Sequence, residues 1–269
     1  MKQYKQILEA VNKGVKFALD DFEVNNTLDV KAKDKVINKD ESLNDAIDFY
    51  VNKVNLGLPS GTLWCKYNVG VNIYELDNAE DWYGNYYAWG EIYPKRTYGF
   101  YNYEYAKYNE NQTEDDLDVF TKYCSDSHFS YDGTTDNLSE LEKEDMPINV
   151  KLRKGDNKNN YSMPTYEQYA ELINHTNSKY VKNYNKVSNL NGVLFISKIN
   201  GKSIFFPCTG FKEYNEFNEN TTYYWSSSIV DGMDPSAWSL KLNLNKKYNS
   251  LIENARVIGF PIRLIYNRQ

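Results

Sequence analysis

The sequence predicts a domain that combines short strands, tight turns and one well-defined helix, preceded by a helical N-terminal segment. Three observations support this. Apolar residues before residue 52 recur at helical spacing, short apolar and aromatic runs separated by turn residues dominate afterwards, and one capped helix is expected within residues 164–177. Aromatic residues make up 16% of the 269 residues, and 25 of them are tyrosines. A chain of this length can bury a full core.

The N-terminal segment, residues 1–51, is predicted to form two helices joined by a polar linker. Alternating spacings of four and three produce a heptad-type seam suited to a partner helix, formed by Tyr4, Leu8, Val11, Val15, Ala18 and Phe22. An amphipathic helix lying on its own domain explains the same spacing. After the linker NNTLDVKAKDKVINKDES, a second helical face contains Leu43, Ala46, Ile47, Tyr50, Val51 and Val54.

The stretch NGVLFISKINGKSIFFP predicts a β-hairpin. Residues 193–199 and 202–206 are rich in β-branched and aromatic residues, and Asn200-Gly201 between them suits a two-residue type I′ turn. Pro207 is expected to end the second strand. Just upstream, Thr165 is a plausible N-cap with Gln168 three residues later, and a helical face is expected to hold Tyr166, Tyr169, Ala170 and Ile173.

The segments YYWSSSIV and AWSLKLN predict paired strands joined by a turn at DGMDP. Alternation places Tyr224 with Ser226 and Ser228 on one face, and Tyr223 with Trp225 and Ser227 on the other. Core packing, with indole N–H groups bonded to the backbone, is expected for Trp64, Trp82, Trp89, Trp225 and Trp238. Residues 104–160 are expected to be mainly long loops, with a short helix near residues 136–145.

Bulk properties narrow the functional classes. The net charge is -6 and the Lys and Arg residues are scattered, so nucleic-acid binding is not expected. No apolar run approaches the roughly 20 residues needed to span a bilayer, and the N-terminus does not resemble a secretory signal. The cysteines, Cys65, Cys124 and Cys208, are odd in number and widely spaced, which argues against disulfides or a zinc knuckle and favours synthesis in a reducing cytoplasm.

An ordered set of motifs carries a family resemblance over residues 52–266. The motifs are VNLGLPSGTLWCKYNVG, YGNYYAWGE followed by YPK, YCSDS, SMPTYEQYAELI, SIFFPCTGF, YYWSSS, AWSL and GFPIRLI. They resemble domains of gut Bacteroidetes and their phages (the Fibrobacter succinogenes major paralogous domain type), which are similar to the formylglycine-generating-enzyme branch of the C-type-lectin fold. Variable ligand-binding proteins diversified by retroelements share that fold.

The resemblance implies a C-type-lectin-like α+β domain over residues 52–269, with small twisted antiparallel sheets, one or two helices and long loops. Residues 1–51 lie outside the resemblance, and we expect them to serve as an anchoring or oligomerisation segment because of their heptad-type seam.

Neither the residues nor the resemblance predicts a catalytic site, a cofactor or a metal. The related oxidase binds copper with paired cysteines, a pairing that this chain does not reproduce. Cys65 and Cys208 are expected to be small buried side chains, and Cys124 is left open. His128 and His175 have bland explanations as a solvated loop residue and a helix C-terminal cation.

Two further kinds of site are also not supported. The pairs Asp115/Asp116 and Glu144/Asp145 lie in polar loops without the burial that an acid/base pair needs. The Glu-Pro-Asn and Trp-Asn-Asp motifs of calcium-dependent lectins are absent.

A binding surface is instead expected near the C-terminal end, where the resemblance places ligand contacts. We call it the C-terminal rim; it consists of Asp231, Met233, Asp234, Ser236, Asn243, Asn245, Lys247, Tyr248, Asn249 and Asn254. Tyr supplies large contact area at low entropic cost, and Asn and Ser supply adaptable hydrogen bonds. An ordinary solvated surface would have the same composition.

The expected function is that of a non-enzymatic bacteriophage virion protein, such as a head or tail fibre. Residues 1–51 would bind capsid or tail proteins and support a homo-oligomer, with a trimer as one candidate. The lectin-like domain would bind a host-surface glycan or protein. The alternatives are a bacterial cell-surface or secreted adhesin of the same fold, which would require export, and a degenerate enzyme of the oxidase branch.

Overall fold

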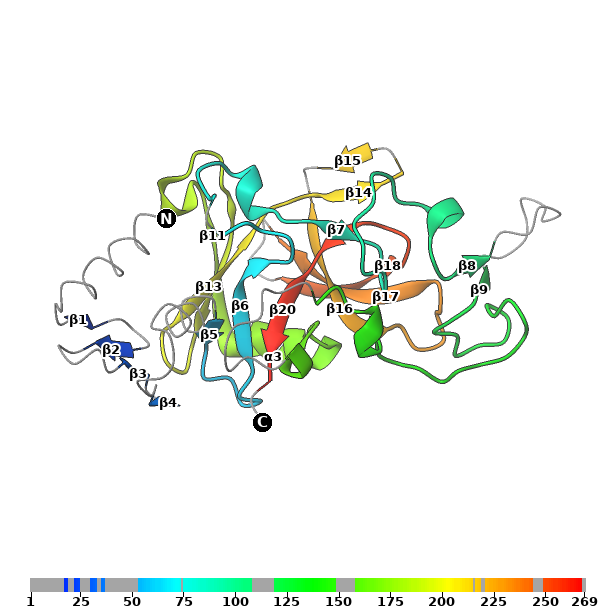
Figure 1. Ribbon diagram of the computed structural model, residues 1–269, viewed down its shortest axis with the longest axis horizontal. Helices are drawn as coiled ribbons and strands as arrows, with labels where there is room; N and C mark the ends of the chain where they lie inside the picture. Colours follow the sequence, from blue (N-terminus) through cyan, green and yellow to red (C-terminus); the bar gives the residue numbers. More distant parts are fainter. Residues whose placement is uncertain are drawn as a thin grey trace.

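A computed structural model describes residues 53–73, 75–107, 119–148, 158–214, 216–218, 221–243 and 249–267, together with the backbone of short strands between residues 17 and 36. These residues form small antiparallel sheets with one α-helix, an α+β arrangement (Figure 1). The coarse fold class expected from the sequence is therefore confirmed. In this part of the chain, no helix is both long and apolar enough to cross a bilayer.

The strands that precede residue 37 overturn part of the predicted N-terminal helix. They are β1 (Phe17–Ala18), β2 (Phe22–Val24), β3 (Val30–Ala32) and β4 (Lys35–Val36), which pair in order as an antiparallel sheet. Ala18 and Phe22, the last two positions of the heptad seam, thus lie in paired strands. Short apolar runs separated by aspartates also suit a hairpin, because Asp favours turns. The rest of the seam lies outside the described residues.

The second predicted helix also fails at its C-terminal end, because Val54 lies in a strand. Strand β5 (Lys53–Asn55) forms one edge of a four-stranded sheet in the order β10-β20-β6-β5. The other members are β6 (Leu63–Asn68), β10 (Tyr161–Ser162) and β20 (Arg263–Tyr266). Strand β6 pairs with β5 on one side and with β20 on the other, so the two ends of the domain meet in one sheet (Figure 1).

The predicted hairpin is present, but its turn differs from the prediction. It joins β12 (Gly192–Ser197) to β13 (Ser203–Pro207), and β11 (Thr176–Val181) completes the sheet. Gly201 has a φ of 73°, whereas Asn200 keeps a negative φ, so the turn is not type I′. The Ser197 hydroxyl accepts hydrogen bonds from the N–H groups of Ile199 and Asn200, which closes a longer connection.

Helix α3 (Tyr166–His175) begins as predicted. The Thr165 hydroxyl accepts a hydrogen bond from the Gln168 N–H at 3.2 Å, and the Gln168 side chain accepts one from the Thr165 N–H at 3.0 Å. This capping box satisfies two otherwise unpaired donors. The buried face differs slightly, because Tyr169 and Leu172 are buried whereas Tyr166 is only half-buried.

The segments YYWSSSIV and AWSLKLN pair as expected. Strands β16 (Thr222–Ile229), β17 (Ser236–Leu242) and β18 (Ser250–Ala255) form one sheet, with a bulge between Trp225 and Ile229. From Tyr224 to Ile229 both faces of β16 are buried, so the alternation of side chains does not separate a buried face from an exposed one. Tyr224 packs in one hydrophobic cluster and Trp225 in another, which makes β16 the partition between them.

Two-stranded sheets and single 3-10 turns complete the domain. The strands are β7 (Tyr86–Tyr87) with β19 (Phe260–Pro261), β8 (Ala106–Lys107) with β9 (Val119–Phe120), and β14 (Phe211–Glu213) with β15 (Glu216–Asn218). The turns are η1 (Glu80–Trp82), η2 (Phe100–Asn102), η3 (Lys143–Asp145), η4 (Lys158–Asn160) and η5 (Tyr184–Lys186). The helix expected near residues 136–145 is thus only the short turn η3.

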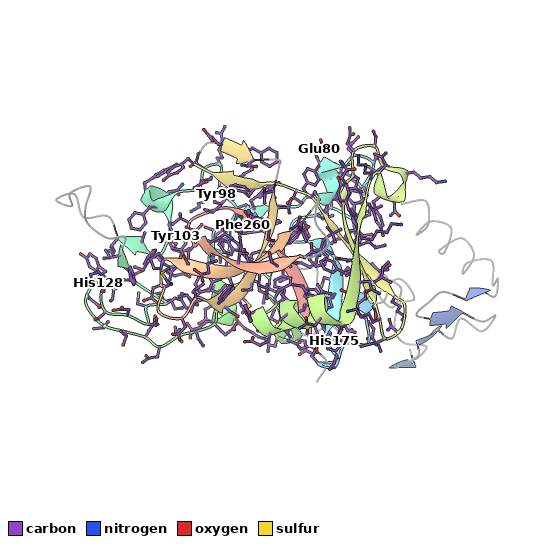
Figure 2. All side chains as sticks on the ribbon, turned by 180° about the vertical axis from the view of Figure 1, so that it is seen from behind. Glu80, Tyr98, Tyr103, His128, His175 and Phe260 are labelled. Carbon is purple, nitrogen blue, oxygen red and sulfur yellow. The ribbon has the colours of Figure 1, made fainter. Side chains whose placement is uncertain are left out.

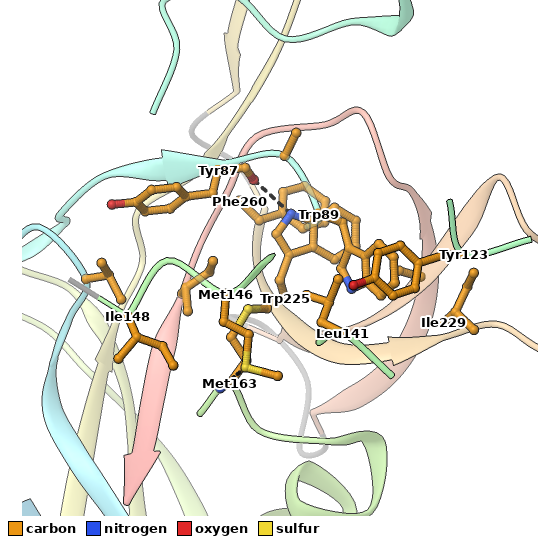
Figure 3. Packing of buried hydrophobic residues seen from close by; sticks show 14 of the residues in the cluster. Tyr87, Trp89, Tyr123, Leu141, Met146, Ile148, Met163, Trp225, Ile229 and Phe260 are labelled. Carbon is orange, nitrogen blue, oxygen red and sulfur yellow. Dashed lines mark hydrogen bonds between the residues drawn. The ribbon is translucent and has the colours of Figure 1, made fainter. Parts of the chain in front are cut away.

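The core is built largely from aromatic rings, as predicted. Trp225 packs 4.3 Å from Phe260 between ring centroids, and its indole N–H donates to the Tyr87 carbonyl at 2.9 Å (Figure 3). The indole N–H groups of Trp89 and Trp82 also donate to backbone carbonyls.

Two tryptophans depart from the core prediction. Trp64 is fully buried, but its N–H finds no acceptor among the described residues. Trp238 is only half-buried, against Tyr166.

Candidate functional site

The C-terminal rim is centred on the turn between β16 and β17. Backbone hydrogen bonds close it, from the Met233 N–H to the Val230 carbonyl at 3.1 Å and from the Ser236 N–H to the Met233 carbonyl at 2.8 Å. Gly232 has a φ of 68°, a conformation that glycine adopts without strain. The turn presents Asp231 and Met233 to solvent, with Met233 48% exposed, and Ser236 is half-buried at the start of β17.

Asp234 does not belong to the exposed surface, which corrects the sequence prediction. Its side chain is fully buried. One carboxylate oxygen accepts a hydrogen bond from the Ser125 hydroxyl at 2.6 Å, and the other accepts one from the Asp126 N–H at 2.8 Å. Asp234 therefore anchors the turn to the loop that contains YCSDS. Its role is structural, and it is not exposed for the ligand contact that the sequence predicted.

The asparagines of the C-terminal rim mainly bind the chain itself. Asn249 is 8% exposed, and its side-chain oxygen accepts a hydrogen bond from the Asn243 N–H at 3.0 Å. Asn254 is half-buried and donates to the Ser239 hydroxyl at 2.8 Å. The burial of Asn249 and its hydrogen bond to the Asn243 backbone contradict the prediction that Asn249 is a ligand contact. Asn245, Lys247 and Tyr248 lie outside the described residues.

The loop to which Asp234 is fastened runs from β9 to Leu141 and is held by a second carboxylate. Asp136 accepts hydrogen bonds from the N–H groups of Tyr123, Cys124 and Leu138. Tyr123 has a φ of 62°, an uncommon conformation for a bulky residue. Two aspartates separated by almost a hundred positions thus hold one loop, and the sequence alone could not distinguish them from solvated neighbours.

Arg256 binds the backbone of this loop, a role that the sequence does not predict. It is fully buried, and its guanidinium donates to the carbonyls of Tyr123 at 2.9 Å and Lys122 at 3.2 Å. The guanidinium carbon lies 4.1 Å from the centroid of the Phe120 ring, a cation–π arrangement. Its Nε has no acceptor among the described residues. Carbonyl dipoles and ring faces therefore balance this charge.

Arg263 is the second buried cation. Its Nε donates to the Asn68 side chain at 2.9 Å, and its terminal nitrogens donate to the carbonyls of Cys65, Lys66 and Phe205. Burial lowers the pKa of this guanidinium. The contacts tie β20 to β6 and β13, so Arg263 is part of the scaffold.

The serine run in YYWSSS is also part of the scaffold. The Ser226 hydroxyl donates to the Trp238 carbonyl at 2.7 Å, and the Ser227 and Ser228 hydroxyls donate to the two carboxylate oxygens of Glu140. Ser228 also accepts a hydrogen bond from the Tyr166 N–H at the start of α3. Each serine is at most 6% exposed. A role for these hydroxyls as solvent-accessible nucleophiles therefore has no geometric support.

An ionic cluster centred on Asp145 contacts the loop that runs from β9 to Leu141. The Asp145 carboxylate contacts the Lys122 ammonium at 2.6 Å and accepts a hydrogen bond from the Tyr123 hydroxyl. Burial acts to raise the pKa of Asp145, but the hydrogen bonds from Lys122 and Tyr123 outweigh it and leave the pKa below its usual value. Burial raises the pKa of Tyr123. A general base needs a pKa near the working pH, so this cluster suits charge pairing rather than proton transfer at neutral pH.

The cysteines and histidines are dispersed. Cys124 is buried, whereas Cys65 and Cys208, predicted to be buried, are only partly so. Burial raises the pKa of the Cys124 thiol to about 11 and that of Cys208 to about 12, so both stay protonated at neutral pH. His128 lies in an exposed loop and His175 ends α3, and the two residues are far apart (Figure 2).

Metal and acid/base chemistry gain no support from the described carboxylates. No group of three or more His, Cys, Asp or Glu residues is placed to hold a metal ion in the part of the chain that the structure describes. Asp115 and Asp116 lie outside that part, and Asp145 is engaged with Lys122 and Tyr123.

Comparisons with protein families, curated proteins and solved structures return no match for this chain. Among the described residues, the candidate binding site is an aromatic scaffold that presents the turn at Asp231 and Met233 beside the loop that Asp234 anchors.

Proposed function

We propose that residues 52–269 form a C-type-lectin-like binding domain of a non-enzymatic bacteriophage virion protein. The observation that carries this proposal is the anchoring of the β16–β17 turn of the C-terminal rim by Asp234. Asp231 and Met233 are exposed on a turn that Asp234 holds rigidly against a second loop. Binding residues are commonly displayed on loops positioned by a rigid scaffold. A preorganised loop also loses less entropy when it binds a partner.

The architecture supports the lectin-like reading. The first and last strands of the domain are joined through β6, small sheets pack with a single helix among the described residues, and long irregular segments connect them. Residues 1–51 would attach the domain to capsid or tail proteins and favour a homo-oligomer. The C-terminal domain would then bind a glycan or protein on the host surface.

The experiment is adsorption to the host cell. Purified protein, added before the phage, should occupy the receptor and reduce adsorption of particles in a dose-dependent way. The double variant Asp231→Ala/Met233→Ala should lose this competition with its melting temperature unchanged, because both side chains are exposed. Glu144→Gln, an exposed change outside the C-terminal rim, is the matched control and should compete like the wild type.

Immunogold electron microscopy of purified particles tests the location. Label on heads or tails is expected. Label on bacterial cells but not on particles would overturn the virion assignment and favour the adhesin. A wild-type protein that binds neither cells nor arrayed glycans would overturn the binding function itself.

A further inference from the structure

The hairpin β14–β15 and the turn η2 together carry an exposed aromatic surface that the proposed function does not use. Tyr214 is 58% exposed and Tyr101 is 61% exposed. Both rings cover Gly99, because a Cβ on this buried glycine would lie 2.9 Å from a Tyr101 ring carbon and 3.2 Å from a Tyr214 ring carbon. We call this pair of tyrosines over Gly99 the aromatic platform. The hairpin lies at the top of the view in Figure 1.

The hairpin breaks two local rules of stability at the aromatic platform. Tyr214 has a φ of 49° in the connection between β14 and β15, where Gly or Asn would be favoured. Its backbone is held in this conformation by hydrogen bonds in both directions with Tyr98. In addition, Glu213 lies directly opposite Glu216, and like charges in that position repel each other.

These violations point to a function, because sequences tend to depart from local preferences where a site requires it. Neither Glu213 nor Glu216 forms an ion pair with any described residue. Arg96, the nearest cation ahead of Tyr98 in the chain, forms none either, and Lys95 is paired with Glu91 at 2.7 Å. Alternation along β14 places Lys212 on the face opposite to Glu213, and its ammonium lies over the Tyr86 ring.

We propose that the aromatic platform, together with Glu213 and Glu216, binds a short basic segment of a polypeptide partner through its Arg or Lys side chains. Tyrosine faces attract a cation, and the carboxylates neutralise it. A bound cation would also relieve the repulsion between the two glutamates, so the site is charge-complementary to this ligand.

The size of the surface sets the length of the segment. The two exposed tyrosines offer about 200–300 Å² of aromatic area. A stable interface between folded proteins needs about 800 Å² from each partner. The platform is therefore suited to a few residues of an extended chain.

The test measures binding of fluorescein-labelled deca-arginine and deca-lysine to the full chain by fluorescence anisotropy, at low and high salt. Wild-type affinity should fall with added salt. Tyr101→Ala and Tyr214→Gly should each weaken binding by roughly fivefold to tenfold without changing the net charge. The double variant Glu213→Gln/Glu216→Gln should weaken it at least as much.

Matched controls separate a built site from general attraction to an acidic protein. Tyr131→Ala removes a tyrosine that is 55% exposed on another loop, and Glu144→Gln removes an exposed carboxylate elsewhere. Both should bind the peptides like the wild type. Equal losses in these controls would show nonspecific electrostatics and overturn the proposal.

Tyr214→Gly also separates binding from folding. Glycine adopts a φ of 49° without strain, so the melting temperature should stay the same or rise while binding falls. A fall in both would mean that Tyr214 is kept for stability, which contradicts the proposal. If Tyr101→Ala and Tyr214→Gly lost binding to arrayed neutral saccharides but bound the peptides like the wild type, the aromatic platform would be a sugar site and the proposal would be overturned. Since this site is separate from the C-terminal rim, host-cell adsorption in the Tyr101 and Tyr214 variants reports on the proposed function independently.

Discussion

Replacing Asp234 by alanine should remove the hydrogen bonds that join the β16–β17 turn to the YCSDS loop. The carboxylate accepts hydrogen bonds from the Ser125 hydroxyl at 2.6 Å and from the Asp126 N–H at 2.8 Å. A hydrogen bond to a charged group contributes about 1.5–3 kcal/mol. Ser125 is half-buried and Asp126 is exposed, so water partly replaces the lost acceptor. We therefore expect the free energy of unfolding to fall by about 2–4 kcal/mol in total.

The assay is thermal unfolding of the full chain, combined with limited proteolysis. For a domain of this size, each kcal/mol lowers the melting temperature by about 2–4 °C, so Asp234→Ala should lower it by roughly 5–15 °C. Cleavage within residues 123–138 should also accelerate, because the loop loses its anchor.

Asp231→Ala is the matched control, since it removes an exposed carboxylate from the same turn and should change the melting temperature by no more than about 2 °C. The reasoning is refuted if the two variants have the same melting temperature and the same cleavage rate. In that case, Asp234 would be free for ligand contact, as the sequence had suggested.

Three further outcomes are expected. Trp225→Ala should cost about 3–5 kcal/mol in unfolding free energy because the ring is fully buried, whereas the half-buried Trp238→Ala should cost less; equal denaturant midpoints for both would contradict this. The pKa of Asp145 lies below its ordinary value of 3.8, so its stabilising effect is present at neutral pH and is lost as the pH falls below about 4. Asp145→Asn should therefore flatten the loss of stability below pH 4 in a series of melts, and an unchanged acid limb would argue against the pairing with Lys122. A chain that begins at residue 52 should sediment as a smaller assembly than the full chain, and identical sedimentation would remove the oligomerisation role of residues 1–51.

Features that depend on neighbours in sequence were predictable. Thr165 and Gln168 stand three positions apart, so the capping box and the start of α3 follow from local chemistry. The β12–β13 hairpin was placed correctly for the same reason. Its turn type was not, because the Asn200 side chain donates to the Asn55 carbonyl, 145 positions away, and the Ser197 hydroxyl captures two turn N–H groups.

Features that depend on distant partners were not predictable from one sequence. Asp231 and Asp234 stand three positions apart in one turn, yet one is exposed and the other is buried because Ser125 and Asp126 fold over it. Arg256 has an ordinary charged appearance, but loop carbonyls and the Phe120 ring replace its hydration. The two-sided burial of β16 likewise arises from packing on both faces, which alternation cannot reveal.

Strands β5 and β20 flank β6 at the same level, with Asn55 and Tyr266 both opposite Leu63. Neighbouring strands lie about 4.8 Å apart, so Asn55 and Tyr266 are about 10 Å apart, and Lys53, where the first strand begins, is about 12 Å from Tyr266. A domain whose two ends lie close together tolerates new connections between them. A linker of a few residues could join Tyr266 to Lys53, and new ends could be opened at the exposed Gly133 loop, which makes the domain a natural candidate for circular permutation or for insertion into a loop of another protein.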